Sequence, residues 1–169
     1  VWSRIRAAVA RAWEASHKAA FFWGTKGKTC EKAGFSHNMI AGFAAAAQTQ
    51  VATLFGDLEK FYEMVSHSVL QQEAAHTNFL MDLLRALVGL YSRPRVISMG
   101  MAVSNIIWCG GTILPGCSCA TTLAKVLLFR SLVKIQNSHP GLHVKNVVDD
   151  VSMQAAGTLK RVKDTLGPA

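Results

Sequence analysis

Two adjacent carboxylates, Asp149 and Asp150, follow an apolar, β-branched pair near the end of the chain. A third acid, Asp57, closes another apolar run, VATLFGD. Adjacent carboxylates repel each other, so we expect a cation or a basic partner beside them. Acids at the ends of neighbouring strands can jointly hold Mg²⁺, which prefers oxygen ligands, and two such ions about 4 Å apart activate a hydroxyl and stabilise a leaving group. Taken alone, an acid at position 57 is more often a helix N-cap.

A second chemical signal, Gly27-Lys28-Thr29, suggests a phosphate-binding loop. That loop needs a glycine five positions before Gly27, where Phe22 stands, and it should follow a buried strand. We therefore interpret the segment as a break between two helices, with lysines that face solvent or a phosphate backbone.

Histidine and cysteine patterns exclude several enzyme classes. No predicted helix carries two histidines at i,i+4 together with an acid, and no Gly-x-Ser-x-Gly segment occurs, so zinc hydrolases and hydrolase triads lack support. Cys30, Cys109, Cys117 and Cys119 form neither a disulfide framework nor paired CxxC knuckles, which indicates free thiols in an intracellular protein. Polar residues and a glycine pair interrupt the apolar region 96–114, which argues against a membrane helix.

Composition favours one domain with an anionic partner. The 169 residues are half apolar, enough to bury one substantial core. Lys and Arg outnumber Asp and Glu by 18 to 10, which indicates nucleic acid, a membrane surface or simply a solvated exterior. The chain lacks an initiator Met and ends abruptly on Gly-Pro-Ala, so we expect a fragment of a longer protein.

The elements that must position the acids can be predicted from periodicity. We expect an amphipathic helix over 3–23, a helix from about 29 through the alanine-rich 41–50, and a short buried strand over 51–57 followed at once by helix. Helices over 59–91 should break near His76 or Thr77. A hairpin around 99–101, a helix over 120–136, a strand pair over 142–148 and 151–154, and a helix over 155–166 complete the chain. This order predicts an α+β fold around a small, mostly antiparallel sheet, as one compact unit.

Four segments resemble those of reverse transcriptases, the RNA-directed DNA polymerases, and especially the enzymes of group II introns and non-LTR retroelements. GDLEKFYEMVSH (56–67) resembles the first catalytic motif, ILPGCSCATTLAKVLL (113–128) the second, and VVDD (147–150) the Tyr-x-Asp-Asp hairpin. GTKGKTCEKAGF (24–35) is similar to the basic, glycine-containing segment that opens the helix before the first motif. The likeness spans roughly residues 24–155. It implies a palm at 51–169, preceded by N-terminal helices of partial fingers at 1–50.

The resemblance implies roles for the residues of the first and third motifs. Asp57 and Asp149 would bind two Mg²⁺ ions, or Mn²⁺, assisted by the Leu58 carbonyl, with Asp150 alongside as a third catalytic and metal-binding acid. Tyr62 would lie beneath the incoming sugar and select deoxynucleoside triphosphates. Without the resemblance, packing of the Tyr62 helix on the sheet is an equal interpretation.

Other roles follow from the second motif and from the basic residues. Gly116 would let backbone approach the nucleotide or template, and Lys125 would reach a phosphate, although a solvated helix face is an equal interpretation. The expected contacts to the RNA template and the DNA primer are Lys26, Lys28, Arg93, Arg95 and Lys145.

The chain departs from the family pattern at three places. Pro115 replaces the Gln of the second motif, Ala120-Thr121 its Ser-Pro, and Val147 the Tyr of the third motif. Triphosphate-binding fingers and a thumb are not recognisable, so we expect them in the full-length protein. The alternative is a truncated or decayed retroelement remnant that binds nucleic acid without catalysis.

Overall fold

A computed structural model describes residues 2–25 and 27–167. The chain divides into two compact units. The helical unit comprises Val1–His17 and Lys60–Leu128, and the sheet unit comprises Lys18–Glu59 and Phe129–Ala169. These units do not follow the division near residue 50 that the sequence suggested, because the first helix packs with residues of the 60–128 segment.

The helical unit contains α1 (Trp2–Ser16), α3 (His67–His76), α4 (Met81–Tyr91) and the first half of α5 (Ala120–Ser138). The indole N–H of Trp13 donates to the Thr77 carbonyl at 2.8 Å, and its ring meets Phe79 edge-on. On the next position of α1, Glu14 accepts a 2.6 Å bond from the Lys125 ammonium of α5. Leucines of α4 and α5 complete a buried core.

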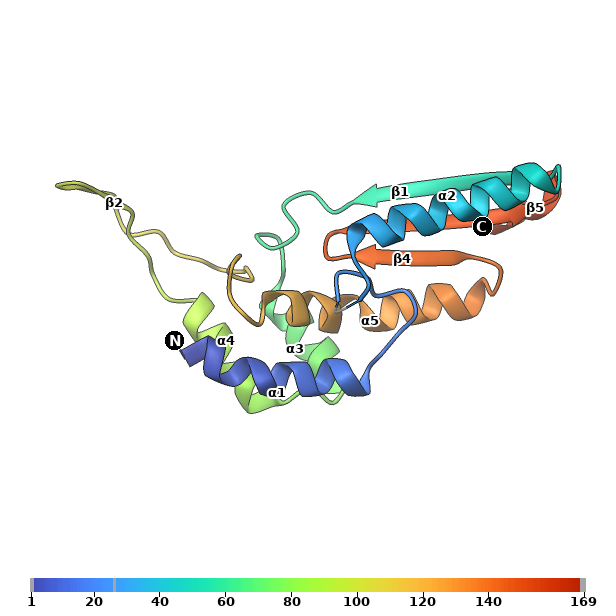
Figure 1. Cartoon of the computed structure of the whole chain (residues 1–169). Helices are drawn as coiled ribbons and strands as arrows, with labels where there is room; N and C mark the ends of the chain where they lie inside the picture. Colours follow the sequence, from blue (N-terminus) through green and yellow to red (C-terminus); the bar gives the residue numbers. More distant parts are fainter. Residues whose placement is uncertain (1, 26, 168–169) are drawn as a thin grey trace. The chain divides into compact units, whose positions relative to one another are not determined.

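The sheet unit is built on three antiparallel strands, β1 (Gln50–Asp57), β4 (His143–Val147) and β5 (Asp150–Gly157). Their order is β1-β5-β4, so β5 is central (Figure 1). β1 pairs with β5 over its whole length, from Gln50 opposite Gly157 to Asp57 opposite Asp150. This register brings both acidic segments to the same end of the sheet.

Helix α2 (Cys30–Ala46) covers one face of this sheet. Thr29 begins the helix as N-cap, its hydroxyl accepting from the Lys32 N–H, as expected for a threonine at that position. His37 of α2 contacts Ser152 and Gln154 of β5. Because side chains alternate along a strand, Asp150 lies on the same face as these two residues.

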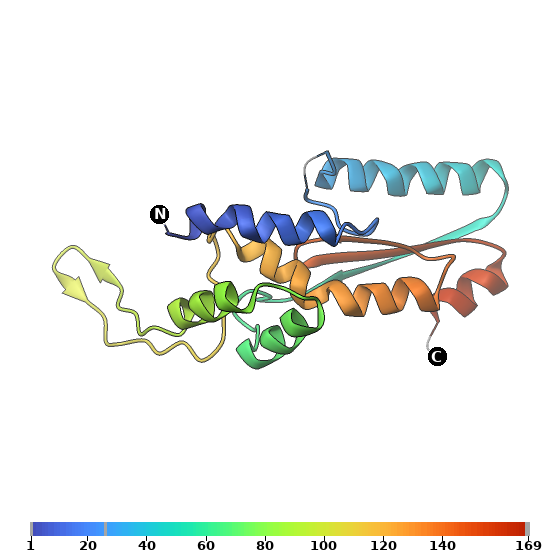
Figure 2. The ribbon, with the colours of Figure 1, turned by 90° about the horizontal axis from the view of Figure 1, so that it is seen from below.

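Helix α6 (Leu159–Leu166) packs against β5 and β1. Its buried Val162 lines a pocket together with Ala52, which faces away from α2 by the same alternation. Figure 2 shows α6 beside the last turns of α5. Helices therefore contact both faces of the three-stranded sheet, and residues 54–57 of β1 stay exposed.

The helix predicted over 3–23 ends earlier, at Ser16. The aromatic residues that follow pack as an extended segment against β4, where the Trp23 N–H donates to the Asn146 carbonyl at 2.8 Å. The Asn146 N–H donates in turn to Phe21 at 2.7 Å, and Phe22 forms a parallel bridge with Asn146. Both phenylalanine rings contact Phe129 of α5. Burial of these rings with satisfied strand hydrogen bonds outweighs continuation of the helical period.

Three further expectations need correction. β1 is not buried, since Leu54 is 55% and Phe55 74% exposed on this edge strand. Helix does not follow Asp57 at once: residues 60–64 form turns, with Lys60 at φ +50°, and α3 begins at His67. Residues 155–157 extend β5 rather than starting the last helix, because they pair with residues 50–52 of β1.

Other expectations are confirmed. The helical region breaks after His76, the hairpin around Gly100 forms from β2 (Ser98–Met99) and β3 (Ala102–Val103), and α5 and the β4–β5 pair occur as predicted. The four cysteines are free thiols. Within the described residues no helix combines the length and apolar character that a membrane crossing needs. The fold is α+β with a small antiparallel sheet.

Candidate active site

The three predicted acids come together at one end of the sheet, which we call the acidic end. Asp57 and Asp150 are direct cross-strand partners on β1 and β5. Their Cβ atoms therefore lie on one face, at the ~5 Å separation typical of such pairs. Asp149 belongs to the two-residue turn between β4 and β5, and its carbonyl accepts from the Leu58 N–H at 3.3 Å. That bond ties the residue after β1 to the acidic turn.

The turn that carries Asp149 is strained and held in place. Val148 has φ +60°, a left-handed conformation that a β-branched residue rarely adopts. Beneath the turn, the buried Asn146 side chain donates to the Val148 carbonyl at 2.9 Å and to the Asp150 carbonyl at 3.2 Å. Both bonds fix the backbone on either side of Asp149. Such strain persists only where surrounding contacts enforce it.

The acids are open to solvent and lack basic partners. Asp57 and Asp150 are exposed and Asp149 is half-buried. Within residues 2–25 and 27–167, none of them forms a salt bridge. Among the described residues, no ion pair offsets the like charges of the cross-strand pair.

Carboxylate oxygens are the ligands that Mg²⁺ prefers, so the donor chemistry at the acidic end fits this ion. The side chains of the described residues form no group of three or more that is already arranged to hold a metal. Asp57 and Asp150 form the nearest pair by register, whereas the resemblance had paired Asp57 with Asp149.

A loop with lysines lies next to the acidic end. A Cβ on Gly24 would lie 3.8 Å from Val147, the residue that pairs with Asp150, so the loop after Phe22 reaches the edge of the acidic turn. Lys28, predicted to contact nucleic acid, donates to the carbonyls of Ala19 and Ala20. It also lies 5.5 Å from the Trp23 ring centroid. Lys26, a further predicted contact, lies outside the described residues.

Lys145 does not fit the role of a backbone contact. It is 5% exposed, donates to the Ala33 carbonyl at 3.1 Å and lies 5.7 Å from the centroid of the Trp23 ring. Burial lowers the pKa of this ammonium from its ordinary value of 10.5. Lys145 faces α2 because it shares the face of Ser152, its partner in the sheet, so it connects strand and helix rather than reaching solvent.

The remaining predicted residues belong to the helical unit. Tyr62 is half-buried, its ring contacts Phe61, and its carbonyl accepts from the Ile113 N–H at 2.7 Å. Gly116 is an exposed turn residue at φ +78°, a conformation that favours glycine. Arg93 is exposed, and Arg95 donates to the Tyr91 carbonyl at 2.9 Å.

Lys125 also does not fit its predicted role. It is 9% exposed and paired with Glu14, whose other oxygen accepts a short hydrogen bond of 2.5 Å from the Thr122 hydroxyl. A lysine committed to a half-buried carboxylate is not available for a phosphate. Glu14 carried no signal in the sequence, because its partners are more than 100 residues away.

A polar cluster beneath α2 was also missed. His37 Nδ1 lies 2.8 Å from Gln154 Oε1, and its Nε2 lies 2.7 Å from the Ser152 hydroxyl. Gln154 Nε2 donates to the His37 carbonyl at 3.2 Å. Since the amide oxygen can only accept, Nδ1 carries the proton and Nε2 accepts from Ser152. Alternation in the segment DVSMQ, which places Asp150, Ser152 and Gln154 on one face, was the available signal.

Comparison with models of known protein families gave no match. A search of curated proteins likewise found no similar sequence.

Proposed function

We propose that this chain is the palm portion of a reverse-transcriptase-like polymerase, with the acidic end as its catalytic centre. The proposed reaction is template-directed attack of a primer 3′-hydroxyl on the α-phosphate of a deoxynucleoside triphosphate. One observation carries the proposal: Asp57 and Asp150, 93 positions apart, are direct cross-strand partners, with Asp149 in the adjoining turn. The motif resemblance supports the same assignment.

In this mechanism the protein supplies carboxylate oxygens on a backbone that strand pairing and the Asn146 hydrogen bonds hold in place. Bound Mg²⁺ would supply positive charge that activates the hydroxyl and stabilises the leaving pyrophosphate. Asp57 and Asp149 would hold the metal, with Asp150 beside them as a third ligand. Asn146 keeps the turn in its strained shape, so the backbone that carries Asp149 and Asp150 need not rearrange when metal binds.

Primer extension tests the proposal. A labelled DNA primer annealed to an RNA template is incubated with deoxynucleoside triphosphates and Mg²⁺ or Mn²⁺, using the chain alone and the chain with flanking coding sequence restored. Asp149→Asn should abolish extension, whereas Glu59→Gln, which also removes an exposed negative charge beyond β1, should retain it. Equal extension by wild type and Asp149→Asn would refute the proposal.

The second candidate is a nucleic-acid-binding remnant without catalysis. The internal pairing of Lys125 with Glu14 favours this candidate, since it removes a predicted phosphate contact of the active enzyme. Extension absent in every context, together with salt-dependent binding of nucleic acid, would identify this second function.

A further inference from the structure

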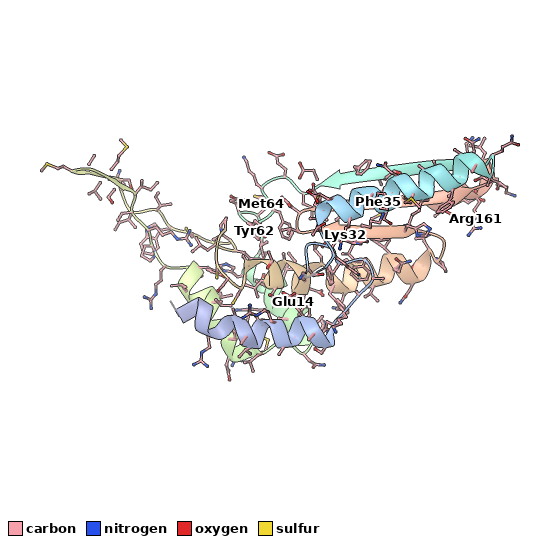
Figure 3. All side chains as sticks on the ribbon, in the orientation of Figure 1. Glu14, Lys32, Phe35, Tyr62, Met64 and Arg161 are labelled. Atoms are coloured by element: carbon pink, nitrogen blue, oxygen red, sulfur yellow. The ribbon has the colours of Figure 1, made fainter. Side chains whose placement is uncertain are left out.

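A cavity of about 390 Å³ lies in the sheet unit at the end of the sheet opposite the acidic end. We call it the distal cavity; it is bounded by residues 138–141, before β4, and by the first turns of α6. Arg161, Lys160 and His139 contribute nitrogen donors to its wall, and Thr158 and Thr165 contribute hydroxyls. Figure 3 shows Arg161 at this end of the unit, away from Lys32 in the first turn of α2.

Two glycines make room for Arg161. A Cβ built on Gly141 would lie 2.9 Å from the guanidinium Nη2, and a Cβ on Gly157 would lie 3.1 Å from the Arg161 Cδ. Both distances are shorter than ordinary contacts, so any larger residue would displace the arginine. The arginine stem therefore packs over Gly157 while its guanidinium reaches across to Gly141 at the cavity wall.

The cationic side chains of this cavity form no ion pair among the described residues. Within the described chain neither Arg161 nor Lys160 forms a salt bridge, although Asp164 also lines the cavity. The His139 ring has no hydrogen-bond partner among these residues. An arginine fork with free N–H groups matches the oxygens of a phosphate, and a neighbouring ammonium adds charge.

We infer that the distal cavity binds a phosphodiester group of a nucleic-acid backbone. Arg161, Lys160 and His139 are all exposed, so a polymer passing over the rim can place one phosphate among them without entering an enclosed site. The net charge of +8 favours such a polyanion over a neutral ligand. The choice of nucleic acid as ligand rests on the proposed function, but the site lies away from the catalytic acids and needs no catalysis.

The test is the salt dependence of binding, measured by fluorescence anisotropy with a fluorescein-labelled RNA–DNA hybrid. The slope of log Kobs against log [salt] should fall by roughly 0.7 to 0.9 in Arg161→Gln and similarly in Lys160→Gln, as for one lost phosphate contact. Lys163→Gln is the matched control, because Lys163 is on the same helix and exposed but does not line the distal cavity. Its slope should change by less than half as much.

A charge-neutral variant provides a second measurement. The added methyl group of Gly141→Ala would clash with the Arg161 guanidinium and displace it. This variant should therefore weaken binding while leaving the net charge unchanged. An unchanged slope in Arg161→Gln, or an equal fall in Lys163→Gln, would overturn the inference. Displacement of the hybrid from wild type by millimolar inorganic phosphate, beyond the effect of chloride at equal ionic strength, would instead identify a small-anion site and overturn the backbone assignment.

Failure of this inference can be separated from failure of the proposed function. If Asp149→Asn extends primers as well as wild type but Arg161→Gln lowers the salt slope, the polymerase proposal is refuted. The inference that the distal cavity binds a backbone phosphate is then still supported. If Asp149→Asn abolishes extension but Arg161→Gln binds with an unchanged slope, only the distal cavity is refuted.

Discussion

Replacing Asp57 or Asp150 by Asn should stabilise the chain when no divalent cation is present. The two carboxylates are direct cross-strand partners on one face, and no basic side chain of the described residues pairs with them. Two unit charges ~5 Å apart in water repel by about 0.8 kcal/mol, and physiological salt roughly halves this energy. The expected gain in the free energy of unfolding is therefore about 0.4 to 0.8 kcal/mol per single variant.

Mg²⁺ should reverse this order of stability. The wild type gains stability because the ion binds the folded state, and a dissociation constant of about 1 mM gives about 1 kcal/mol at ~5 mM Mg²⁺. Asp57→Asn and Asp150→Asn each lack one metal ligand, so Mg²⁺ should raise their free energy of unfolding much less than that of wild type. Without metal the variants are more stable than wild type, and with metal the difference disappears or changes sign.

The assay is urea unfolding followed by circular dichroism, in EDTA and in Mg²⁺. With a slope of about 2 kcal/mol/M, the expected shift in midpoint is about 0.2 to 0.4 M. Glu59→Gln is the control, since this exposed acid lies beyond β1 with no acid opposite, and its midpoint should not change. If both Asn variants are less stable than wild type in EDTA, the acids do not repel as the register requires and the reasoning is refuted.

Other contacts give further expectations. Burial lowers the pKa of His37, and the charge of Lys145 lowers it further, although the hydrogen bond that His37 donates to Gln154 opposes this shift. The unfolded chain therefore binds the His37 proton more tightly, and the free energy of unfolding should fall as the pH drops below 6.5. Urea midpoints should show a weaker fall with pH in His37→Gln. A double-mutant cycle of Glu14→Ala and Lys125→Met should give a coupling of about 1 to 3 kcal/mol, because either single change leaves a largely buried charge unpaired; coupling near zero would contradict the pair. Substituting Asn at Val148 should raise the thermal midpoint by relieving about 1 kcal/mol of strain, and a lower midpoint would show that the valine side chain matters more.

The acidic end could be predicted from the sequence because the patterns that define it lie within a few residues of the acids. β-branched residues before the paired acids and the alternation that follows them define a hairpin, and the apolar run before Asp57 defines a strand. The topology then requires only that these strands become neighbours. The exact register, with Asp57 opposite Asp150 rather than Asp149, depends on the conformation of the β4–β5 turn. That conformation could not be predicted, because Val148 has a positive φ that a β-branched residue rarely adopts.

The roles of the lysines could not be anticipated in the same way. From sequence alone, a lysine on a strand or helix is predicted to be an exposed charge, because its distant partners are not known. Lys145 turns toward α2 and Lys125 toward Glu14, each through contacts more than 100 residues apart. The segment after Ser16 shows the same limit, since its aromatic residues follow a helical period but pair with the edge of β4.

Paramagnetic relaxation by Mn²⁺ tests the central claim most directly. On a ¹⁵N-labelled chain, substoichiometric Mn²⁺ should selectively broaden the amide signals of residues 56–58 and 148–151 together, and Asp57→Asn should reduce the broadening at both segments. Broadening confined to one segment, or unchanged in Asp57→Asn, would contradict a shared cation site at the acidic end.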